Sequence, residues 1–374
     1  MRAYVFTDAS LQRYAGQFVW LSVDTENSKN AKFLSRFQTP GVPAFFVINA
    51  KDESLVTRYV GGFTLASLKK FLDENKPRKE AVPGEGLLLE ADRLATEGKH
   101  HEAADAYDHA LKALPKKSLR YGRAAEGLIL SLQMKDETQG RCAERGLELA
   151  RELAGTVSGA NVASGALDCE SGLKPEEQNA ATFDALQKMV EEAVHSTTLD
   201  LSGDDRSGYY ITLISAHVMR KDEAGARKLR EEWSAFLDRQ AANAKTPEER
   251  AVYDPHRLTA YLELGTPEKA IPMLQQTAKE IPNDYNPFSR LAAAYRAMKK
   301  WDEAITEGKH AIALCEGPRR ITIYRGLVDA YNGKGDKAGA TATLKEAIAY
   351  AEGLPDGQRN ANVIASLKKK LETM

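Results

Sequence analysis

The sequence predicts a mostly α-helical protein, in which a small α/β domain at the N-terminus is followed by an α-solenoid of helical hairpins. Two observations lead to this fold class. Eight of the eleven phenylalanines lie in the first 71 residues, whereas the rest of the chain is rich in Ala, Leu, Glu, Lys and Arg, which are strong helix formers. From residue 85 onward, small and aromatic residues recur about every 34 residues, a period typical of stacked helix pairs.

We expect an α/β domain over residues 1–76, a linker over 77–84 and a helical repeat domain over 85–374. The linker is predicted because the polar stretch between the two compositions is bracketed by Pro77 and Pro83. A length of 374 residues is typical of two or three domains, or of one domain with a repeat array.

Charge and hydropathy exclude several classes of protein. Lys and Arg number 52 against 53 Asp and Glu, and this balance argues against a dedicated nucleic-acid binder, which would carry a basic excess. No apolar run approaches the ~18 residues of a membrane span, and the N-terminus lacks a signal-peptide pattern. We therefore expect a soluble, cytoplasmic chain as given, although sequence upstream of Met1 could carry a signal peptide.

The first part of the chain is expected to have the element order α-β-α-β-β-α. Helices are predicted over 1–14, 27–37 and 65–74. Strands are predicted over 18–23, 44–49 and 55–60, which are β-branched and aromatic runs. The short turn at 51–54 predicts an antiparallel hairpin of the last two strands. The run 18–23 is apolar enough to predict a strand that is buried on both sides.

The segment Gln38–Val47, with the sequence QTPGVPAFFV, resembles the thioredoxin-family segment in which a cis proline leads into the third strand. The resemblance extends over residues 1 to about 75 and includes the glycine pair Gly61-Gly62 before the last helix. It implies a thioredoxin-like domain with a cis bond between Val42 and Pro43. The alternative for Pro43 is an ordinary trans proline that opens a strand.

The resemblance also indicates what the chain lacks. A thioredoxin fold begins with another strand and then a Cys-x-x-Cys motif, whose thiol pKa is lowered by the N-terminus of the first helix. Met1 already lies within the part that matches this helix, so the chain as given is redox-inactive. Either the true start lies upstream, which we favour because 18–23 is built for burial, or the domain has lost its redox chemistry.

The helical part contains a repeat marked by Ala304, with Tyr295 nine residues before it and Ala311 seven residues after it. The equivalent positions of the neighbouring copies, displaced by 34 and 36 residues, hold Tyr261, Ala270, Thr277, Tyr331, Ala340 and Ala347. An earlier copy lies around Ala103. This helix–turn–helix, in which small residues let two helices approach, resembles the tetratricopeptide repeat (TPR). The resemblance implies a TPR array, in which Thr277 is the one imperfect position.

The middle of the chain is less regular. We predict a degenerate helix pair over 119–154, a break over 155–161, a helix over 175–194, a polar loop over 199–205 and helices over 209–219 and 223–240. At the C-terminus, Lys368-Lys369-Lys370 predicts a solvated helix face rather than a nucleic-acid patch.

No catalytic or metal-binding motif is found in the helical part, so no cofactor and no metal are expected, and enzymatic activity stays uncertain. The spacing of Cys142, Cys169 and Cys315 fits no metal site, and we expect three separate thiols. A Cys142–Cys169 disulfide would require an oxidising compartment. No histidine pair has the spacing of a zinc site, and Gly333–Asp336 lacks the remaining residues of a phosphate loop.

Stacked repeats form a concave groove that suits an extended peptide or a partner helix. The resemblance places these residues in the groove of the last two copies: Asn286, Ser289, Arg290, Arg296, Arg325, Asp329 and Asn332. TPR proteins that grip a C-terminal carboxylate need Lys, Arg or Asn where Ser289 and Ala293 stand, which argues against that subtype. Arg290, Arg296 and Arg325 could still attract an acidic segment, because guanidinium groups suit carboxylates. Ordinary surface arginines are the alternative.

Two functions are consistent with these features. The first is a protein–protein interaction scaffold, in which the TPR groove binds a protein or peptide partner and the thioredoxin-like domain is redox-inactive. The second is a thiol–disulfide oxidoreductase whose Cys-x-x-Cys lies upstream of Met1 and whose repeats recruit clients.

Overall fold

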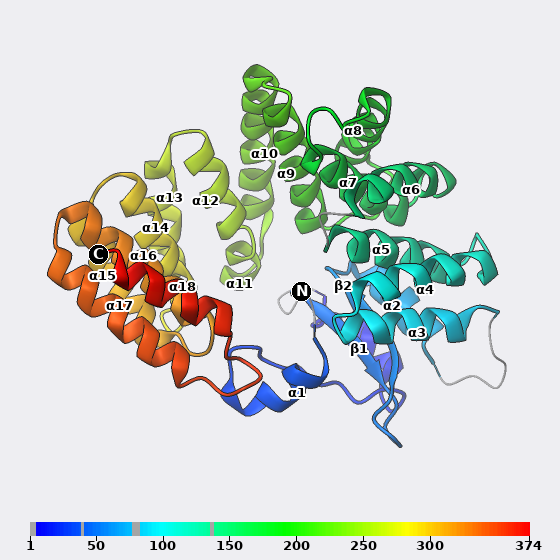
Figure 1. Cartoon of the computed structure of the whole chain (residues 1–374), viewed down its shortest axis with the longest axis horizontal. Coiled ribbons are helices and arrows are strands. Elements are labelled where there is room, and N and C mark those ends of the chain that lie inside the picture. The colour runs from blue at the N-terminus through cyan, green and yellow to red at the C-terminus, as the bar shows by residue number, and fades with distance from the viewer. Residues whose placement is uncertain (1–4, 39–40, 77–82, 135–137) are drawn as a thin grey trace. The chain divides into compact units, whose positions relative to one another are not determined.

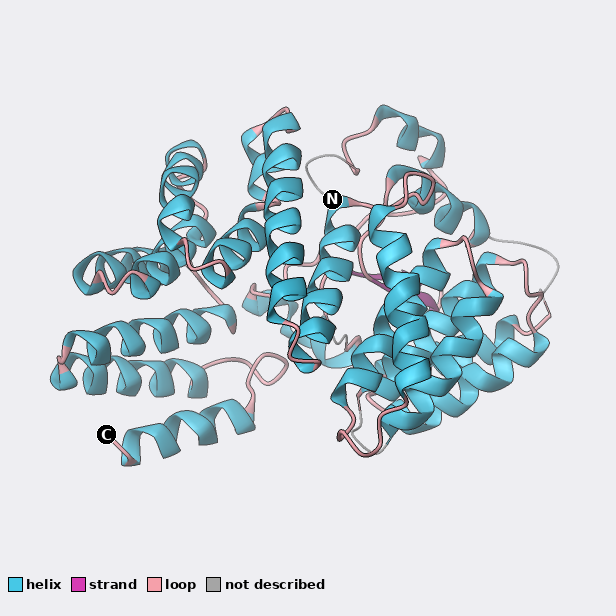
Figure 2. Ribbon diagram, turned by 90° about the horizontal axis from the view of Figure 1, so that it is seen from above, coloured by secondary structure: helices cyan, strands magenta, loops and turns pink. Residues whose placement is uncertain are grey.

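The computed structural model describes residues 5–38, 41–76, 83–134 and 138–374. The chain forms two compact units, which we call unit 1 (Met1–Phe18 and Gln38–Leu229) and unit 2 (Val19–Phe37 and Arg230–Met374). Helices dominate both units, and the described residues contain one sheet, of two strands (Figures 1 and 2). The predicted fold class, mostly α with a helical solenoid, is confirmed. Residues 77–82 of the expected linker lie outside the described residues.

Unit 1 contains the short helix η1 (Ala9–Tyr14), the strands β1 (Ala44–Ile48) and β2 (Leu55–Val60), and the helix α2 (Leu65–Glu74). The strands are antiparallel, with Ala44 opposite Val60, so the predicted hairpin is confirmed. The Val42–Pro43 peptide bond is cis, the isomer that the resemblance implies. Before α2, the Thr64 side chain accepts a hydrogen bond from the Ser67 N–H, and this cap explains where the helix begins.

The aromatic residues of the first 71 positions form the core that joins the hairpin to α2. Its buried members are Val5, Tyr14, Phe63, Leu68, Phe71 and Leu72. The Tyr59 and Phe63 rings are stacked, with their centroids 4.3 Å apart. Because large rings remove much apolar surface from water, a few of them suffice to hold a two-stranded sheet against one helix.

The strand predicted over 18–23 is wrong. Residues 18–23 form neither strand nor helix, and Val19 and Leu21 are 87% and 81% exposed. A β-branched run becomes a buried strand only where another strand and a core are present, whereas this run connects the last residue of one unit to the next unit. The helix predicted over 1–14 appears only as η1, and residues 1–4 lie outside the described part.

The rest of unit 1 is an array of helical hairpins. Its helices are α3 (Glu85–Thr96), α4 (His100–Ala113), α5 (Leu119–Gln133), α6 (Gln139–Glu152), α7 (Val157–Gly172), α8 (Ala180–His195) and α9 (Gly203–Met219). The first helix of each hairpin also contacts the first helix of the next, in the series α3, α5, α7 and α9. This series forms one continuous face of unit 1, as expected for a solenoid.

The helix break predicted over 155–161 is wrong in its extent, because α7 already begins at Val157. Gly155 adopts a left-handed conformation that turns the chain after α6, and the Thr156 side chain then caps the new helix. Gly159 serves close packing: a Cβ there would lie 2.3 Å from the Leu153 carbonyl oxygen. A glycine-rich stretch therefore begins a helix here. The other predicted helices of this region are present, with shifted ends.

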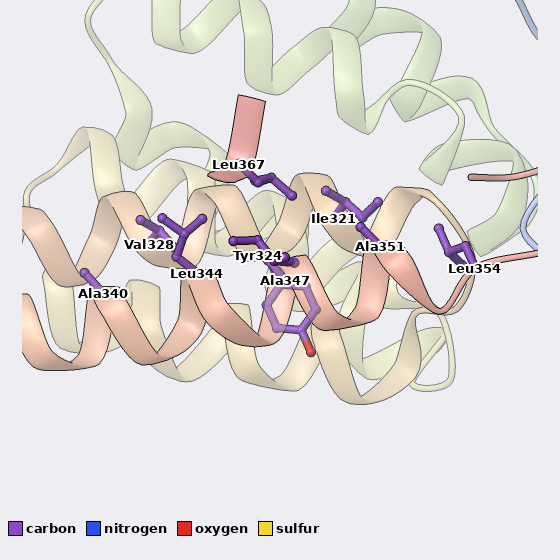
Figure 3. Close-up of a cluster of buried hydrophobic side chains, with 10 residues drawn as sticks. Ile321, Tyr324, Val328, Ala340, Leu344, Ala347, Ala351, Leu354 and Leu367 are labelled. Carbon is purple, nitrogen blue, oxygen red and sulfur yellow. The ribbon is translucent and has the colours of Figure 1, made fainter. Parts of the chain in front are cut away.

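Unit 2 continues the array. Helix α10 (Glu223–Asn243) starts in unit 1, and it is followed by α11 (Pro247–Ala251), α12 (Asp254–Glu263), η4 (Pro267–Lys269), α13 (Ala270–Glu280), α14 (Tyr285–Ala297), α15 (Trp301–Leu314), α16 (Arg319–Lys334), α17 (Lys337–Glu352) and α18 (Ala361–Glu372). Ala270, Ala304 and Ala340 are buried where paired helices cross, which confirms the repeat read from the sequence. Figure 3 shows the apolar cluster that joins α16 and α17 to Leu367 of α18.

Cys142 and Cys169 form a disulfide between α6 and α7, with their Cα atoms 6.0 Å apart. The expectation of separate thiols is therefore wrong for this pair. The two helices pack side by side, and a spacing of 27 residues brings the cysteines together although it matches no sequence motif. Cys315 is a free, buried thiol, and burial raises its pKa to about 12. Within the described ranges, no helix is both long and apolar enough to cross a bilayer.

Candidate partner-binding surfaces

In unit 1, strand β2 lies against the face formed by α3 and α5. The Asp92 carboxylate of α3 accepts hydrogen bonds from the Arg58 N–H (3.2 Å) and the Thr57 hydroxyl (3.1 Å). Arg123 of α5 donates to the Arg58 carbonyl at 2.6 Å. Side chains of the helices thus bind both backbone groups of one strand residue, as a groove would bind a peptide.

Asp92 is the centre of this contact. It is 1% exposed, and it also accepts hydrogen bonds from the Tyr107 hydroxyl (2.7 Å) and from Arg123 (2.8 Å). Burial raises the pKa of Tyr107 well above its ordinary value, so this hydroxyl remains a donor. The buried carboxylate therefore has four hydrogen-bond donors, one of which is the guanidinium group of Arg123, and these compensate for its loss of hydration.

The polar contacts continue along the same face of unit 1. Asn161 of α7 donates to Glu126 of α5 at 3.3 Å and accepts from Tyr209 of α9 at 2.7 Å. Burial raises the pKa of Glu126. Beyond β2, Thr64 donates to Asp200 at 2.6 Å. The chain's own segment from Arg58 to Thr64 therefore covers this face of unit 1.

A cavity of ≈ 40 Å³ lies beside this contact and is lined by Arg58, Asp92, Tyr107, Arg123 and Glu126, among others. It has room for one or two waters but is far smaller than the several hundred Å³ that enclose a small-molecule substrate. The polar network around it therefore stabilises the contact of strand β2 with helices α3 and α5. Among the described residues, no group of three or more His, Cys, Asp or Glu side chains has the arrangement of a metal site.

In unit 2, the residues predicted to line a groove lie on α14 and α16, two helices in direct contact (Figure 1). Asn286 donates to Asp284, the residue that caps α14, at 2.8 Å. Asp329 is paired with Lys370 of α18 at 3.0 Å. Ser289 is half-buried and Asn332 is exposed. These four side chains shape the surface but carry no unbalanced charge.

The three predicted arginines are half-buried. Within the described part of the chain, Arg290, Arg296 and Arg325 have no ion pair within 4.0 Å, and Arg290 makes only a long hydrogen bond (3.4 Å) to Asn286. Burial lowers the pKa of both Arg290 and Arg296. The Arg296 guanidinium lies against α16, since a Cβ at Gly326 would come within 2.5 Å of its Nη1 atom. Arg290 and Arg296 are thus partly desolvated guanidinium groups without an ion pair within 4.0 Å, and Asp254 and Asp284 offset the charge of Arg290, and Asp329 that of Arg296, only in part.

Sequence reasoning missed Asp254, which lies behind this surface at the start of α12. It is fully buried, and the Thr277 hydroxyl donates to its Oδ2 atom at 2.8 Å. This bond explains the imperfect position of the repeat, where threonine replaces alanine. The Oδ1 atom has no hydrogen-bond partner among the described residues, and the nearest guanidinium, that of Arg257, is 3.9 Å away. Burial raises the Asp254 pKa, partly opposed by Arg290 and Arg257.

The hairpin array defines a helical-repeat protein, an α-solenoid of TPR-like hairpins. No family model matches the chain, and no curated protein matches it. Among solved structures, "MamA AMB-1 P212121" is similar over 46% of this chain and 92% of its own, with 20% identity and a TM-score of 0.31. YrrB, described as "a TPR protein with an unusual peptide-binding site", is similar over 61% and 92%, with 15% identity and a TM-score of 0.29. The STAND protein PH0952 of Pyrococcus horikoshii, which has a TPR sensor, is similar over 82% and 49%, with 14% identity and a TM-score of 0.35.

Proposed function

We propose that the chain is a protein–protein interaction scaffold and that unit 2 binds an acidic partner segment against α14 and α16. The observation that carries this proposal is the set of three arginines, Arg290, Arg296 and Arg325, which have no ion pair among the described residues. By contrast, Arg141, Arg145 and Arg230 pair with carboxylates of other helices. A partner's carboxylates would add close ion pairs to guanidinium groups whose nearest carboxylates in the chain, Asp254 and Asp284 for Arg290 and Asp329 for Arg296, form none within 4.0 Å.

Unit 2 is the better candidate for an external partner because of what covers unit 1. The equivalent face of unit 1 already holds strand β2, through Asp92 and Arg123. A partner would have to displace this strand, which is anchored by several buried hydrogen bonds. The α14–α16 face requires no such exchange.

Fluorescence anisotropy tests the proposal with two labelled peptides, (Glu-Ala)₅ and its neutral counterpart (Gln-Ala)₅. We expect the acidic peptide alone to bind, with an affinity that falls as salt is raised. The double variant Arg296→Ala/Arg325→Ala should bind it at least tenfold more weakly, since charge-assisted hydrogen bonds contribute about 1.5–3 kcal/mol each. Lys345→Ala, which removes an exposed positive charge from α17, is the matched control. Equal binding by the double variant and the control would refute this assignment of the surface.

A second candidate is the thiol–disulfide oxidoreductase whose Cys-x-x-Cys lies upstream of Met1. The order of β1, β2 and α2 after Pro43 supports it, since this is the order that the thioredoxin resemblance implies. The absence of a strand over 18–23 counts against it. An in-frame Cys-x-x-Cys in the upstream coding sequence would support this candidate. Insulin reduction by the chain itself should be blank.

The boundaries expected from the sequence, at 1–76, 77–84 and 85–374, stay a prediction about the modules of this chain. Limited proteolysis within 77–84, followed by size-exclusion chromatography, tests it. Because Arg58 and Thr57 are bound by Asp92 across this boundary, we expect the two fragments to remain associated after cleavage.

A further inference from the structure

Residues Asp24–Phe37, which we call the strap, pack on unit 2 although they come from the N-terminal part of the chain. The strap contains η2 (Ser28–Asn30) and α1 (Ala31–Arg36). It contacts two turns of unit 2: the turn 315–318 between α15 and α16, and the turn 353–360 between α17 and α18. The first of these contacts reaches the start of α16, near Tyr285 of α14, whereas Arg325, and Arg296 beside Gly326, lie further along α16.

The first contact is electrostatic. The Glu26 carboxylate accepts a hydrogen bond from the backbone N–H of Arg319, the first residue of α16, at 2.8 Å. The N-terminus of a helix carries unpaired N–H groups and a partial positive charge, both of which favour a carboxylate. The N-cap residue of α16 is Pro318, which offers no side-chain hydrogen bond. Glu26 therefore supplies a cap that the local sequence lacks.

The second contact is steric, and two glycines make room for it. A Cβ at Gly317 would lie 2.6 Å from the Glu26 Cα atom, and one at Gly357 would lie 2.0 Å from the Ala31 carbonyl oxygen. Gly317 has a positive φ of 67°, which by itself favours glycine. Gly357 has no such requirement. Position 357 is thus a glycine because the backbone of the strap occupies the space that a side chain would need.

The third contact fixes the strap backbone. Gln358, which is buried, donates to the Thr25 carbonyl at 2.8 Å. The strap is also shaped by its own side chains, because Asp24 accepts the Glu26 N–H at 2.9 Å and its carbonyl accepts from Asn30 at 2.8 Å. This turn points the Glu26 carboxylate toward α16. Unit 2 thus binds the Glu26 carboxylate and the backbone of the strap, whose Ala31 and Phe37 side chains are buried.

We propose that the turns 315–318 and 353–360 form a peptide-docking site whose resident ligand is the strap. The partner that fits the same site is a protein segment with three features: Asp or Asn to form the turn, Glu two residues later, and a small residue five positions after that Glu. These are the features of Asp24, Glu26 and Ala31. Such a segment binds when the strap leaves. The residues before the strap form no regular structure and are largely exposed at Val19 and Leu21, so release of the strap has to break only its own contacts, which include the buried Ala31 and Phe37.

The test uses the full chain and a labelled peptide of residues 22–37. In the Glu26→Lys chain the strap is repelled from α16, and we expect the peptide to bind it at least tenfold more tightly than it binds the wild-type chain, where the attached strap competes. A peptide with the same Glu26→Lys change should not bind. Adding Gly357→Val to the Glu26→Lys chain should abolish binding, because the valine fills the place of the strap backbone. Adding Arg296→Ala/Arg325→Ala should leave it unchanged, which separates this site from the α14–α16 face.

The proposal is overturned if the Glu26→Lys chain, with a wild-type circular dichroism spectrum, does not bind the peptide, or if Gly357→Val has no effect. A second measurement applies if the Glu26→Lys chain does not fold. Amide hydrogen exchange is then followed in the ¹⁵N-labelled wild-type chain with an excess of unlabelled peptide. Exchange in Lys29–Phe37 should accelerate with the wild-type peptide and not with the Glu26→Lys peptide. Equal exchange in both cases would also overturn the proposal.

Discussion

Replacing Asp92 with alanine should detach strand β2 from the helices of unit 1. Asp92 accepts hydrogen bonds from Tyr107, Thr57, Arg123 and the Arg58 N–H, and its side chain is only 2% exposed. The alanine leaves the Arg123 guanidinium, itself 16% exposed, without its carboxylate. Removing one partner of a buried ion pair costs about 3–5 kcal/mol.

The magnitude can be read from amide exchange in Leu55–Val60. Because a chain with two compact units need not unfold in a single two-state step, a single global free energy of unfolding is not the quantity to measure. A local loss of about 3 kcal/mol corresponds to an exchange rate roughly 150-fold faster in β2, at about 1.4 kcal/mol per tenfold. Far-UV circular dichroism should change little, because the helices keep their own apolar contacts.

Asp105→Ala is the matched control. Asp105 pairs with Arg141 at 2.9 Å, but both side chains are largely exposed, at 50% and 41%. An exposed pair contributes about 0–1 kcal/mol, so this variant should leave exchange in β2 unchanged. If the amide exchange rates of β2 in the Asp92→Ala variant were within about threefold of those in the wild-type chain, hydrogen bonds to Asp92 would not be what holds the strand. The reasoning would then fail.

Three further predictions concern other buried groups. Reduction of the Cys142–Cys169 disulfide should destabilise unit 1 by about 3.5 kcal/mol, because the unfolded chain regains the entropy of the 27-residue loop. Urea unfolding with and without a reductant measures this loss. If the urea concentration at the midpoint of unfolding does not change, the bond is absent in solution. Asp254 has a pKa raised by burial, so its contribution to stability is complete below the unfolded value of about 3.9 and is lost as the pH rises through the raised pKa. The stability of the Asp254→Asn variant relative to the wild-type chain should therefore increase between pH 4 and 7, and melting temperatures measure this. If the difference in melting temperature between the two chains were the same at every pH, the raised pKa of Asp254 would be contradicted. Cys315, with its pKa raised to about 12, should not react with iodoacetamide at pH 8 until the chain is unfolded, and rapid labelling of the native chain would contradict its burial.

The disulfide prediction also concerns location. The sequence led us to expect the cytoplasm for the chain as given, whereas a stable Cys142–Cys169 bond is typical of an oxidising compartment. The intact mass of the native protein from its source, taken without reductant, tests both points. A mass two hydrogens below the calculated value would support the bond, and a larger mass than that of the printed sequence would support an upstream extension.

Features set by local pattern were predictable from the sequence. The hairpin of β1 and β2 follows from two apolar runs and a short turn, and the repeats follow from buried alanines such as Ala304, because both patterns lie within about 40 residues. The run 18–23 has the composition of a strand, but no other strand pairs with it among the described residues. A strand depends on residues outside itself.

The polar network of unit 1 was missed for a related reason, although one signal was present. Asp92 lies on the apolar face of α3, between Leu88 and Ala95, where a charge is unexpected unless it is paired. Its partners Arg58 and Arg123 are more than 30 residues away in either direction, and no spacing rule links them. The Cys142–Cys169 bond was missed in the same way.

The strap has a consequence for the order in which the chain is made. The strap is made well before its site, because the Gln358 side chain that binds Thr25 is synthesised 333 residues later. At roughly 5–20 residues per second, the nascent chain carries the strap without its site for roughly 17 to 67 s. The cap on α16 can form only after this wait. Unit 2 therefore cannot be completed until long after the strap has been made, and the free strap is a segment that a chaperone or a partner can meet first.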